Sequence, residues 1–357
     1  MSRRPRTAPS TPLWKTLGDF LVHEWLPAIN PTVRATTYLG YRCHVERHIR
    51  PRIGTVHLAK VDATTLNSFY AALLAPTKAG GAGLSPTTVQ RVHATIHRAL
   101  RDAVKWGRIP KNPADDCDPP RERSRFGHEM VTWSPTELRK FLDGVRADRL
   151  YALWVLLATT GMRRGEALGL RWSDVDLANA QLAVRQSLVA AGSEVYLSKP
   201  KTARGRRVVA LDERTVEALT GHRRRQERER RSRPHDDADL VFCEPDGGPL
   251  SPPAISKLFV QLVKEMGLPR IRLHDLRHTH ATLALRAGIH PKIVSERLGH
   301  ATVSMTLDVY SHAIPSLQKE AAARVADLVF DLVGGLRPRL KISRAWSRLR
   351  GLLPSKR

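Results

Sequence analysis

Apolar residues recur at helical spacing through the first hundred residues of the chain. One face of a helix that begins near residue 14 collects Leu17, Phe20, Leu21 and Trp25. The same spacing predicts three further helices, over residues 33–49, 62–74 and 85–106. We therefore expect the N-terminal part of the chain to fold as a small all-helical bundle.

The predicted helix over residues 85–106 has two different sides. Ser85 and Pro86 form a good helix start, because a serine N-cap is followed by proline in the first turn. The core stripe consists of Val89, Val92, Ile96, Leu100 and Val104. The opposite side carries Arg91, His93, Arg98, Arg101 and Lys105. One packed face and one basic face suit a bundle that contacts phosphates.

A proline-rich stretch separates this bundle from the rest of the chain. Residues 109–126 contain Pro110, Pro113, Pro119 and Pro120, a composition typical of a linker. Ser134 then restarts the chain as an N-cap, with Glu137 completing a capping box. We expect a disordered basic N-terminus (1–12), a helical domain (13–115), a linker (116–130), a second domain (131–333) and a basic tail (334–357).

The second domain mixes helices with short β-branched runs. A strongly apolar helix is expected over residues 150–160, and more helices over 253–266 and 316–333. Runs at 181–187, 194–198 and 206–211 predict a small antiparallel sheet. The expected fold class is mainly α, with an N-terminal helical bundle and a C-terminal mixed α+β domain.

The charge of the chain points to a polyanionic partner. Lysine and arginine number 59 against 34 acidic residues, which gives a formal net charge of +25. That excess favours nucleic acid, with a basic ribosome-like or membrane-surface protein as the alternative. The three cysteines, Cys43, Cys117 and Cys243, are far apart, so neither a disulfide framework nor a cysteine zinc site is expected. A reducing cytoplasm fits, because the basic N-terminus lacks the apolar core of a signal peptide and the most apolar run is too short to span a bilayer.

Residues 272–312 concentrate candidate chemistry. His274, Asp275 and His278 read H-D-x-x-H, close to the H-E-x-x-H of zinc proteases. This zinc-hydrolase alternative is weakened by aspartate in place of glutamate and by Arg277, whose charge between the two ligands would repel a metal. No metal is therefore expected.

A second candidate lies where the apolar helix ends, in the sequence T-G-M-R-R-G-E. Arg163 and Arg164 stand next to a core helix and need anionic partners. The partner could be a carboxylate such as Glu166, in a structural ion pair, or a phosphate.

Five motifs follow one another in a specific order. They are T-G-M-R-R-G-E, then K-T-x-x-G-R-R before a strand, H-D-L-R-H-T-H-A-T, L-G-H and Y-S-H. This combination resembles the tyrosine recombinase (phage integrase) family over residues 134–315. The helical region over 14–114 is similar to the core-type DNA-binding domain of that family. Many integrases of this type carry an additional N-terminal domain for arm-type sites, whereas here only about a dozen residues precede the first helix. Binding of arm-type sites is therefore not expected, unless the basic N-terminus or the tail substitutes for that domain.

The resemblance implies an enzyme that breaks and rejoins DNA strands without metal or nucleotide cofactor. Tyr310 would attack the scissile phosphate and form a 3′-phosphotyrosyl link, releasing a 5′-hydroxyl. Lys201 would protonate the leaving 5′-oxygen, with Lys199 as a competitor for this role. His312, just after the nucleophile, is expected to be incidental.

The remaining implied roles concern the phosphate. Arg163 and Arg277 would bind its non-bridging oxygens, since guanidinium donates two hydrogen bonds and stays charged. His274 would assist proton transfer with the nucleophile, and His300 would donate to the phosphate. Glu166 would orient the arginines.

The leading hypothesis is therefore a site-specific recombinase that integrates or excises a mobile element. Its partners would be double-stranded DNA attachment sites, bound by a homotetramer on two duplexes through a Holliday junction, with accessory DNA-bending or directionality factors. A type IB topoisomerase-like enzyme with the same chemistry and a non-catalytic DNA-binding protein are the alternatives.

Overall fold

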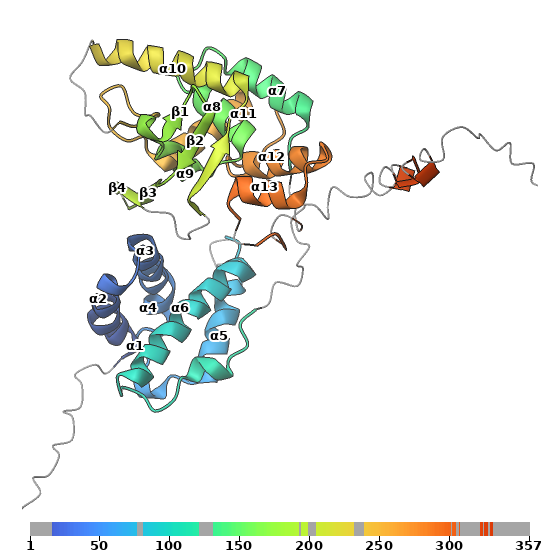
Figure 1. Cartoon of the computed structure of the whole chain (residues 1–357). Helices are drawn as coiled ribbons and strands as arrows, with labels where there is room; N and C mark the ends of the chain where they lie inside the picture. Colours follow the sequence, from blue (N-terminus) through green and yellow to red (C-terminus); the bar gives the residue numbers. More distant parts are fainter. Residues whose placement is uncertain are drawn as a thin grey trace, which may run out of the picture.

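The computed structural model describes most of the chain, in two lobes that each have a hydrophobic core (Figure 1). The described residues are 16–76, 81–120, 131–192, 194–198, 205–231, 239–300, 302–304, 307, 322–323, 325–327 and 329–330. The predicted N-terminus (1–12), the whole predicted tail (334–357), Lys201 and Tyr310 lie outside the described residues. Within the described part, no helix is both long and apolar enough to cross a membrane.

The N-terminal lobe is all-helical, as predicted. Its α-helices are α1 (Leu17–Asp19), α2 (Leu26–Ile29), α3 (Ala35–His44), α4 (Arg50–Ile53), α5 (Ala63–Leu74) and α6 (Pro86–Lys105). Two π-helical segments, η1 (Phe20–Trp25) and η3 (Val45–Ile49), and three short 3₁₀ turns, η2 (Asn30–Thr32), η4 (Leu58–Lys60) and η5 (Pro113–Asp116), connect them.

The long helix α6 anchors the core of this lobe. Ser85 caps it as predicted, accepting a hydrogen bond from the backbone of Thr88. Trp25 is fully buried, and its indole Nε1 donates to Asp102 Oδ2 of α6 at 2.9 Å. The predicted apolar stripe of α6 is confirmed, except that Val104 is only half-buried and Ala103 fills the core beside it. The lobe is therefore held by one amphipathic helix against the first turns of the chain.

The C-terminal lobe wraps helices around two small sheets. Its helices are α7 (Pro135–Gly144), α8 (Tyr151–Thr160), α9 (Arg164–Leu168), η6 (Trp172–Asp174), α10 (Glu213–Arg231), α11 (Pro252–Glu265), α12 (Asp275–Arg286) and α13 (Pro291–Leu298). The capping box predicted at Ser134 and Glu137 starts α7. The apolar helix α8 runs through the centre of the lobe and ends at Gly161, whose φ of 64° is left-handed.

The strands form two antiparallel sheets where the sequence predicted one. β1 (Val175–Asp176), β2 (Gln181–Val184) and β5 (Arg207–Ala210) make a three-stranded sheet in the order β1-β2-β5, and β3 (Ser187–Ala191) pairs with β4 (Glu194–Ser198). The run predicted over 181–187 divides at Arg185 and Gln186. Gln186 Nε2 donates to the carbonyl of Gly169 at 2.8 Å, and Arg185 pairs with Asp174 at 2.9 Å. These side chains turn the backbone out of β2 and into β3.

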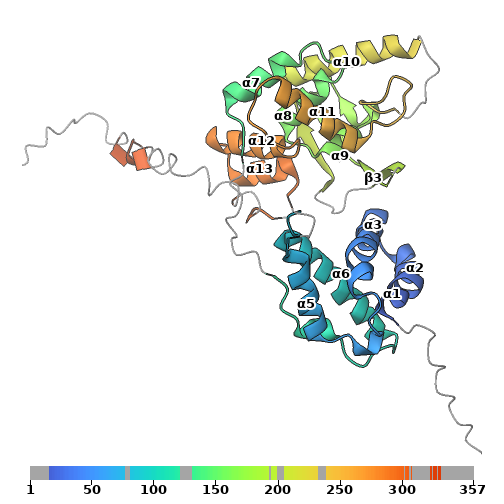
Figure 2. The same ribbon diagram turned by 180° about the vertical axis from the view of Figure 1, so that it is seen from behind.

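The lobes meet through β3 and α3, and α12 and α13 lie on the side of the C-terminal lobe that faces the N-terminal lobe (Figures 1 and 2). Helix α10 lies at the opposite end of the C-terminal lobe. The motif-bearing helices are therefore oriented towards the space between the lobes.

Four aromatic rings form the centre of the C-terminal core. Phe259 of α11 lies 5.3 Å from Phe141, 5.8 Å from Trp133 and 5.9 Å from Trp154 between ring centroids. Phe259 is fully buried, whereas its neighbour Val260 is 39% exposed.

We expect Phe259→Ala to lower the free energy of unfolding of this lobe by about 3–5 kcal/mol, because it removes buried area and leaves a cavity. Val260→Ala is the matched control on the same helix, and its cost should stay within about 0.5 kcal/mol. Urea unfolding followed by tryptophan fluorescence measures both. Equal costs for the two variants would contradict the packing role of Phe259.

Candidate active site

The predicted arginines, Arg163 and Arg277, converge from different helices. Arg163 is the N-cap residue of α9, directly after the left-handed turn at Gly161. Arg277 lies in the first turns of α12 and is only 4% exposed. Its Nη1 donates to the carbonyl of Gly161 at 2.8 Å, and its Nη2 to that of Leu298 at 2.7 Å. The end of α8, the start of α12 and the end of α13 are thus joined by one guanidinium.

Gly161 cannot be replaced without moving this junction. A Cβ there would lie 2.5 Å from Leu298 Cδ2 and 2.8 Å from His280 Cδ2, and the left-handed φ already disfavours other residues. The glycine of the T-G-M-R-R-G-E motif therefore allows α8 to end against α12 and α13 and to present Arg163 beside Arg277.

The carboxylate of Glu166 lies buried between two arginines. Its Oε1 accepts from Arg163 Nη1 at 2.7 Å, and its Oε2 accepts from Arg207 Nη2 at 2.8 Å. Burial alone would raise the pKa of Glu166, but the hydrogen bonds and charges of Arg207 and Arg163 outweigh it and lower that pKa. Glu166 is therefore ionised, as a residue that orients arginines must be. The ion pair considered from the sequence is formed, and it leaves 39% of the Arg163 side chain exposed.

Arg207 is a member of the cluster that the sequence analysis did not identify. It is the first residue of β5, and its side chain is 7% exposed. A signal was present, because strand residues alternate between faces and Arg207 shares the face of the buried Val209, opposite the exposed Val208. An arginine on the same face of a strand as a buried residue needs an anionic partner, and Glu166 is that partner.

Positive charge exceeds negative charge in this cluster. Among the described residues, Arg163 and Arg207 both pair with the carboxylate of Glu166, and Arg277 lies close enough to feel its charge without bonding it. The pKa of Arg277 falls to about 9, because it is buried and because Arg163 and Arg207 repel its charge, with Glu166 opposing the change. A bound oxyanion would relieve this repulsion and could accept hydrogen bonds from the guanidinium forks.

Histidines border the cationic cluster. His300 directly follows Gly299, whose carbonyl accepts from Arg163 Nη2 at 3.1 Å. The pKa of His300 falls to about 4, because of its partial burial and then because of Arg277 and Arg163. His300 is therefore neutral at pH 7 and can act as a hydrogen-bond partner without adding charge.

The other histidines separate into surface and packing positions. His274 is the N-cap residue of α12, and its ring packs edge-on against His278 with 5.2 Å between centroids. His280 lies on the inner side, where its Nδ1 bonds the carbonyl of Ala158 at 3.1 Å. This contact makes His280 a packing residue between α12 and α8.

The described residues bear on two questions raised by the sequence: which of the two adjacent arginines faces the cluster, and whether a zinc site is present. Arg164 points away from the cluster and donates to Ser256 Oγ of α11 at 2.6 Å, which favours Arg163 as the phosphate ligand. For the zinc alternative, the described part of the chain contains no group of three His, Cys, Asp or Glu side chains that could hold a metal ion.

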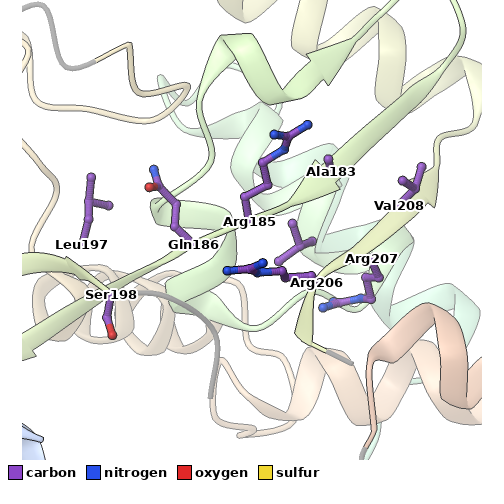
Figure 3. A pocket seen from close by; sticks show the side chains of 9 residues that line it. Ala183, Arg185, Gln186, Leu197, Ser198, Arg206, Arg207 and Val208 are labelled. Atoms are coloured by element: carbon purple, nitrogen blue, oxygen red, sulfur yellow. The ribbon is translucent and has the colours of Figure 1, made fainter. Parts of the chain in front are cut away.

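Lys201 lies between β4 and β5 in the sequence, and Tyr310 follows His300 in the sequence. Both assignments remain predictions, since neither residue is described. Ser198, the last residue of β4, and Arg206, just before β5, border a cavity of about 680 Å³ between the two sheets, shown in Figure 3. Arg185, Arg206 and Arg207 supply its cationic groups.

The lowered histidine pKa values predict that acid weakens the C-terminal lobe before its carboxylates titrate. The pKa of His280 falls from 6.5 to about 4, because of burial and then the charge of Arg297, and that of His300 falls to about 4 as well. Between these values the unfolded chain binds more protons, so stability is complete above pH 6.5 and falls as the pH decreases towards 4.

Thermal unfolding between pH 7.5 and 5 measures this dependence. His280→Gln keeps an amide donor for the carbonyl of Ala158 but does not titrate, so its melting temperature should vary less with pH than that of the wild type. Parallel pH profiles of the two proteins would be inconsistent with a neutral His280.

Comparisons with known proteins show which proteins this chain resembles. A tyrosine recombinase XerC-like protein of Caldanaerobacter subterraneus subsp. tengcongensis is 27% identical in an alignment of 332 positions that covers 88% of this chain and 83% of that protein. The ICEBs1 integrase of Bacillus subtilis is 26% identical over 87% of this chain and 82% of its own length.

Solved structures share the fold. The Tn1549 transposon integrase in complex with a circular intermediate DNA matches with a TM-score of 0.69 and 23% identity, over 87% of this chain and 99% of that chain. The lambda integrase in a tetramer bound to a Holliday junction matches with a TM-score of 0.60 and 17% identity, over 84% of this chain and 78% of that chain. The model of the phage integrase family matches residues 134–316, just over half of the sequence, and the chain belongs to that family.

Proposed function

We propose that this protein is a site-specific DNA recombinase that breaks and rejoins DNA strands through a 3′-phosphotyrosyl intermediate. One observation carries the proposal: in a member of the phage integrase family, Arg163 and Arg277 are brought together in a cluster with more positive than negative charge. Such a cluster suits a phosphodiester, whose charge it would neutralise and whose developing charge it would stabilise.

The proposed cleavage step is a phosphoryl transfer that needs neither a reductant nor a nucleotide. His274 accepts the phenol proton of Tyr310, the phenolate attacks the scissile phosphorus, the P–O5′ bond breaks, and Lys201 gives its proton to the leaving 5′-oxygen. Arg163 and Arg277 bind the non-bridging oxygens. Attack by the 5′-hydroxyl of another strand reverses these events and returns the proton, so the bond energy stays in the phosphotyrosine.

The histidines would act as uncharged partners in this scheme. His300, neutral at pH 7, donates one hydrogen bond to the phosphate, and His274 at the open start of α12 assists proton transfer with the nucleophile. Glu166 stays ionised and orients Arg163 through the hydrogen bond that its Oε1 accepts from Arg163 Nη1.

We further propose that the N-terminal helical domain (13–115) binds DNA opposite the catalytic domain (131–333). The space between the lobes, faced by α12 and α13, is the position for a duplex. A homotetramer on two duplexes is supported by the fold shared with the lambda integrase, which was solved as a tetramer on a Holliday junction. Residues after Tyr310 would dock on a neighbouring subunit, since Val325, Val329 and Phe330 are 55–73% exposed.

The relatives that are integrases of mobile elements favour recombination over the alternatives. A type IB topoisomerase-like enzyme would use the same chemistry on single duplexes, and a non-catalytic DNA-binding protein would not need the cluster. Attachment sites of a mobile element, with accessory bending or directionality factors, are the proposed partners, and the cytoplasm, where such DNA lies, is the proposed compartment.

A nicked suicide substrate carrying the attachment site, incubated with chelator, tests the proposal. We expect a covalent protein–DNA adduct that Tyr310→Phe abolishes. Arg163→Ala and Arg277→Ala should each slow its formation by about 10²–10³-fold, because each removes a donor to the developing charge.

Arg164→Ala is the matched control, because Arg164 points away from the cluster and bonds Ser256. Adduct formation that requires added metal or survives Tyr310→Phe would refute the mechanism. Relaxation of arbitrary supercoiled DNA by the monomer would favour the topoisomerase instead.

A further inference from the structure

The C-terminal end of α13 is held by three arginines at once. Three successive carbonyl oxygens each accept a hydrogen bond from a different guanidinium. The pairs are Arg207 Nε with Arg297 (2.7 Å), Arg277 Nη2 with Leu298 (2.7 Å) and Arg163 Nη2 with Gly299 (3.1 Å). Carbonyls at a helix C-terminus carry partial negative charge, so they suit cations that have too few carboxylate partners.

Arg207 differs from the other two arginines in how its donors are used. Its Nε, Nη1 and Nη2 each donate to a protein oxygen, those of Arg297, Gly205 and Glu166 respectively. Its contact with the Glu166 carboxylate makes it the charged partner that shares Glu166 with Arg163. Arg207 is therefore placed to act on the other cations and not on a substrate.

The sheet determines where this guanidinium lies. Arg207 pairs with Val184 of β2 in the last register position of the ladder. Val209, two residues on, is 1% exposed, whereas Val208 is 64% exposed. A slip of one residue would turn Arg207 to solvent, so the pairing of β5 with β2 aims the side chain at α9 and α13.

We propose that Arg207 is a positioning residue for the phosphate-binding arginines. By holding Glu166 Oε2 and the carbonyl of Arg297 together, it ties α9 to α13 and sets the spacing between Arg163 and Arg277. Glu166 Oε2 also accepts from the backbone N–H of Arg163 at 3.0 Å, so without Arg207 the whole carboxylate is left to Arg163 and draws its guanidinium away from the phosphate. This inference rests on the proposed function, because it assigns a role in that reaction.

Single-turnover cleavage of the suicide substrate at saturating DNA gives the first test. Arg207→Met should slow cleavage about a hundredfold, since a misplaced binding group costs rate, while the Kd for DNA stays unchanged. Arg207→Lys restores the charge but cannot bridge two oxygens like the guanidinium fork, so its rate should be intermediate.

A double-mutant comparison asks whether Arg207 acts through Glu166. Arg207→Met combined with Glu166→Gln should cleave no more slowly than Glu166→Gln alone. Arg149→Met is the matched control for stability, because Arg149 forms a similar fork with Glu229 at 2.8 Å and a bond to the carbonyl of Cys243 far from the cluster. It should lower the melting temperature without changing the cleavage rate constant.

A substrate with a neutral methylphosphonate at the scissile position separates positioning from a merely structural role. Removing one charged oxygen makes an arginine contact dispensable, so the penalty of Arg207→Met should shrink in parallel with that of Arg163→Ala. An unchanged penalty, a wild-type rate in Arg207→Met, or losses that multiply with Glu166→Gln would each overturn the inference.

Sulfate provides a readout that does not require recombination. Its binding to the cationic cluster should raise the melting temperature of the wild type and of Arg149→Met, and should raise that of Arg207→Met much less. If the wild type forms no covalent adduct, the proposed function fails, and the sulfate measurement still decides whether Arg207 shapes the anion site.

Discussion

The buried carboxylate of Glu166 is the interaction on which the site depends. An isolated buried charge is costly, and so is each guanidinium around it, but together they form a network whose members are all hydrogen-bonded. Arg163 and Arg207 share the two oxygens of Glu166, while Arg277, which has no carboxylate bond, relies on the carbonyls of Gly161 and Leu298. One anion among three cations keeps the cluster folded and still leaves it short of negative charge.

Because the cluster has fewer carboxylates than guanidiniums, its arginines also use backbone carbonyls from several elements. The end of α8, the start of α9, the start of α12 and the end of α13 each contribute a backbone or side-chain group to the same small volume, and β5 adds Arg207 from the sheet. Helix C-termini present carbonyls, so cations placed there gain partners that need no further acidic residue. A phosphate can then supply the missing charge without competing against a second carboxylate.

The sequence predicted the fold class, most helices and the motif arginines, because helical periodicity, caps and short motifs are local signals. It did not separate the two sheets, since the turn from β2 to β3 depends on contacts of Gln186 and Arg185 with distant residues. Arg207 was missed for a related reason: its partners, Glu166 and the carbonyl of Arg297, lie 41 and 90 residues away. Motif spacing cannot reveal such a contact, although the alternation within β5 marked the residue as inward-facing.

The histidine beside the arginine cluster is uncharged at neutral pH. A protonated imidazole at His300 would add another positive charge beside Arg277 and Arg163, and burial together with these arginines lowers its pKa to about 4. The same lowering leaves one ring nitrogen as a donor and the other as an acceptor at neutral pH. The arginines therefore supply positive charge at neutral pH, where even Arg277, with its pKa lowered to about 9, is protonated, and the neutral imidazole of His300 would orient the bound group. A site built this way would attract an anion through the charge of its arginines and would orient it through an uncharged imidazole.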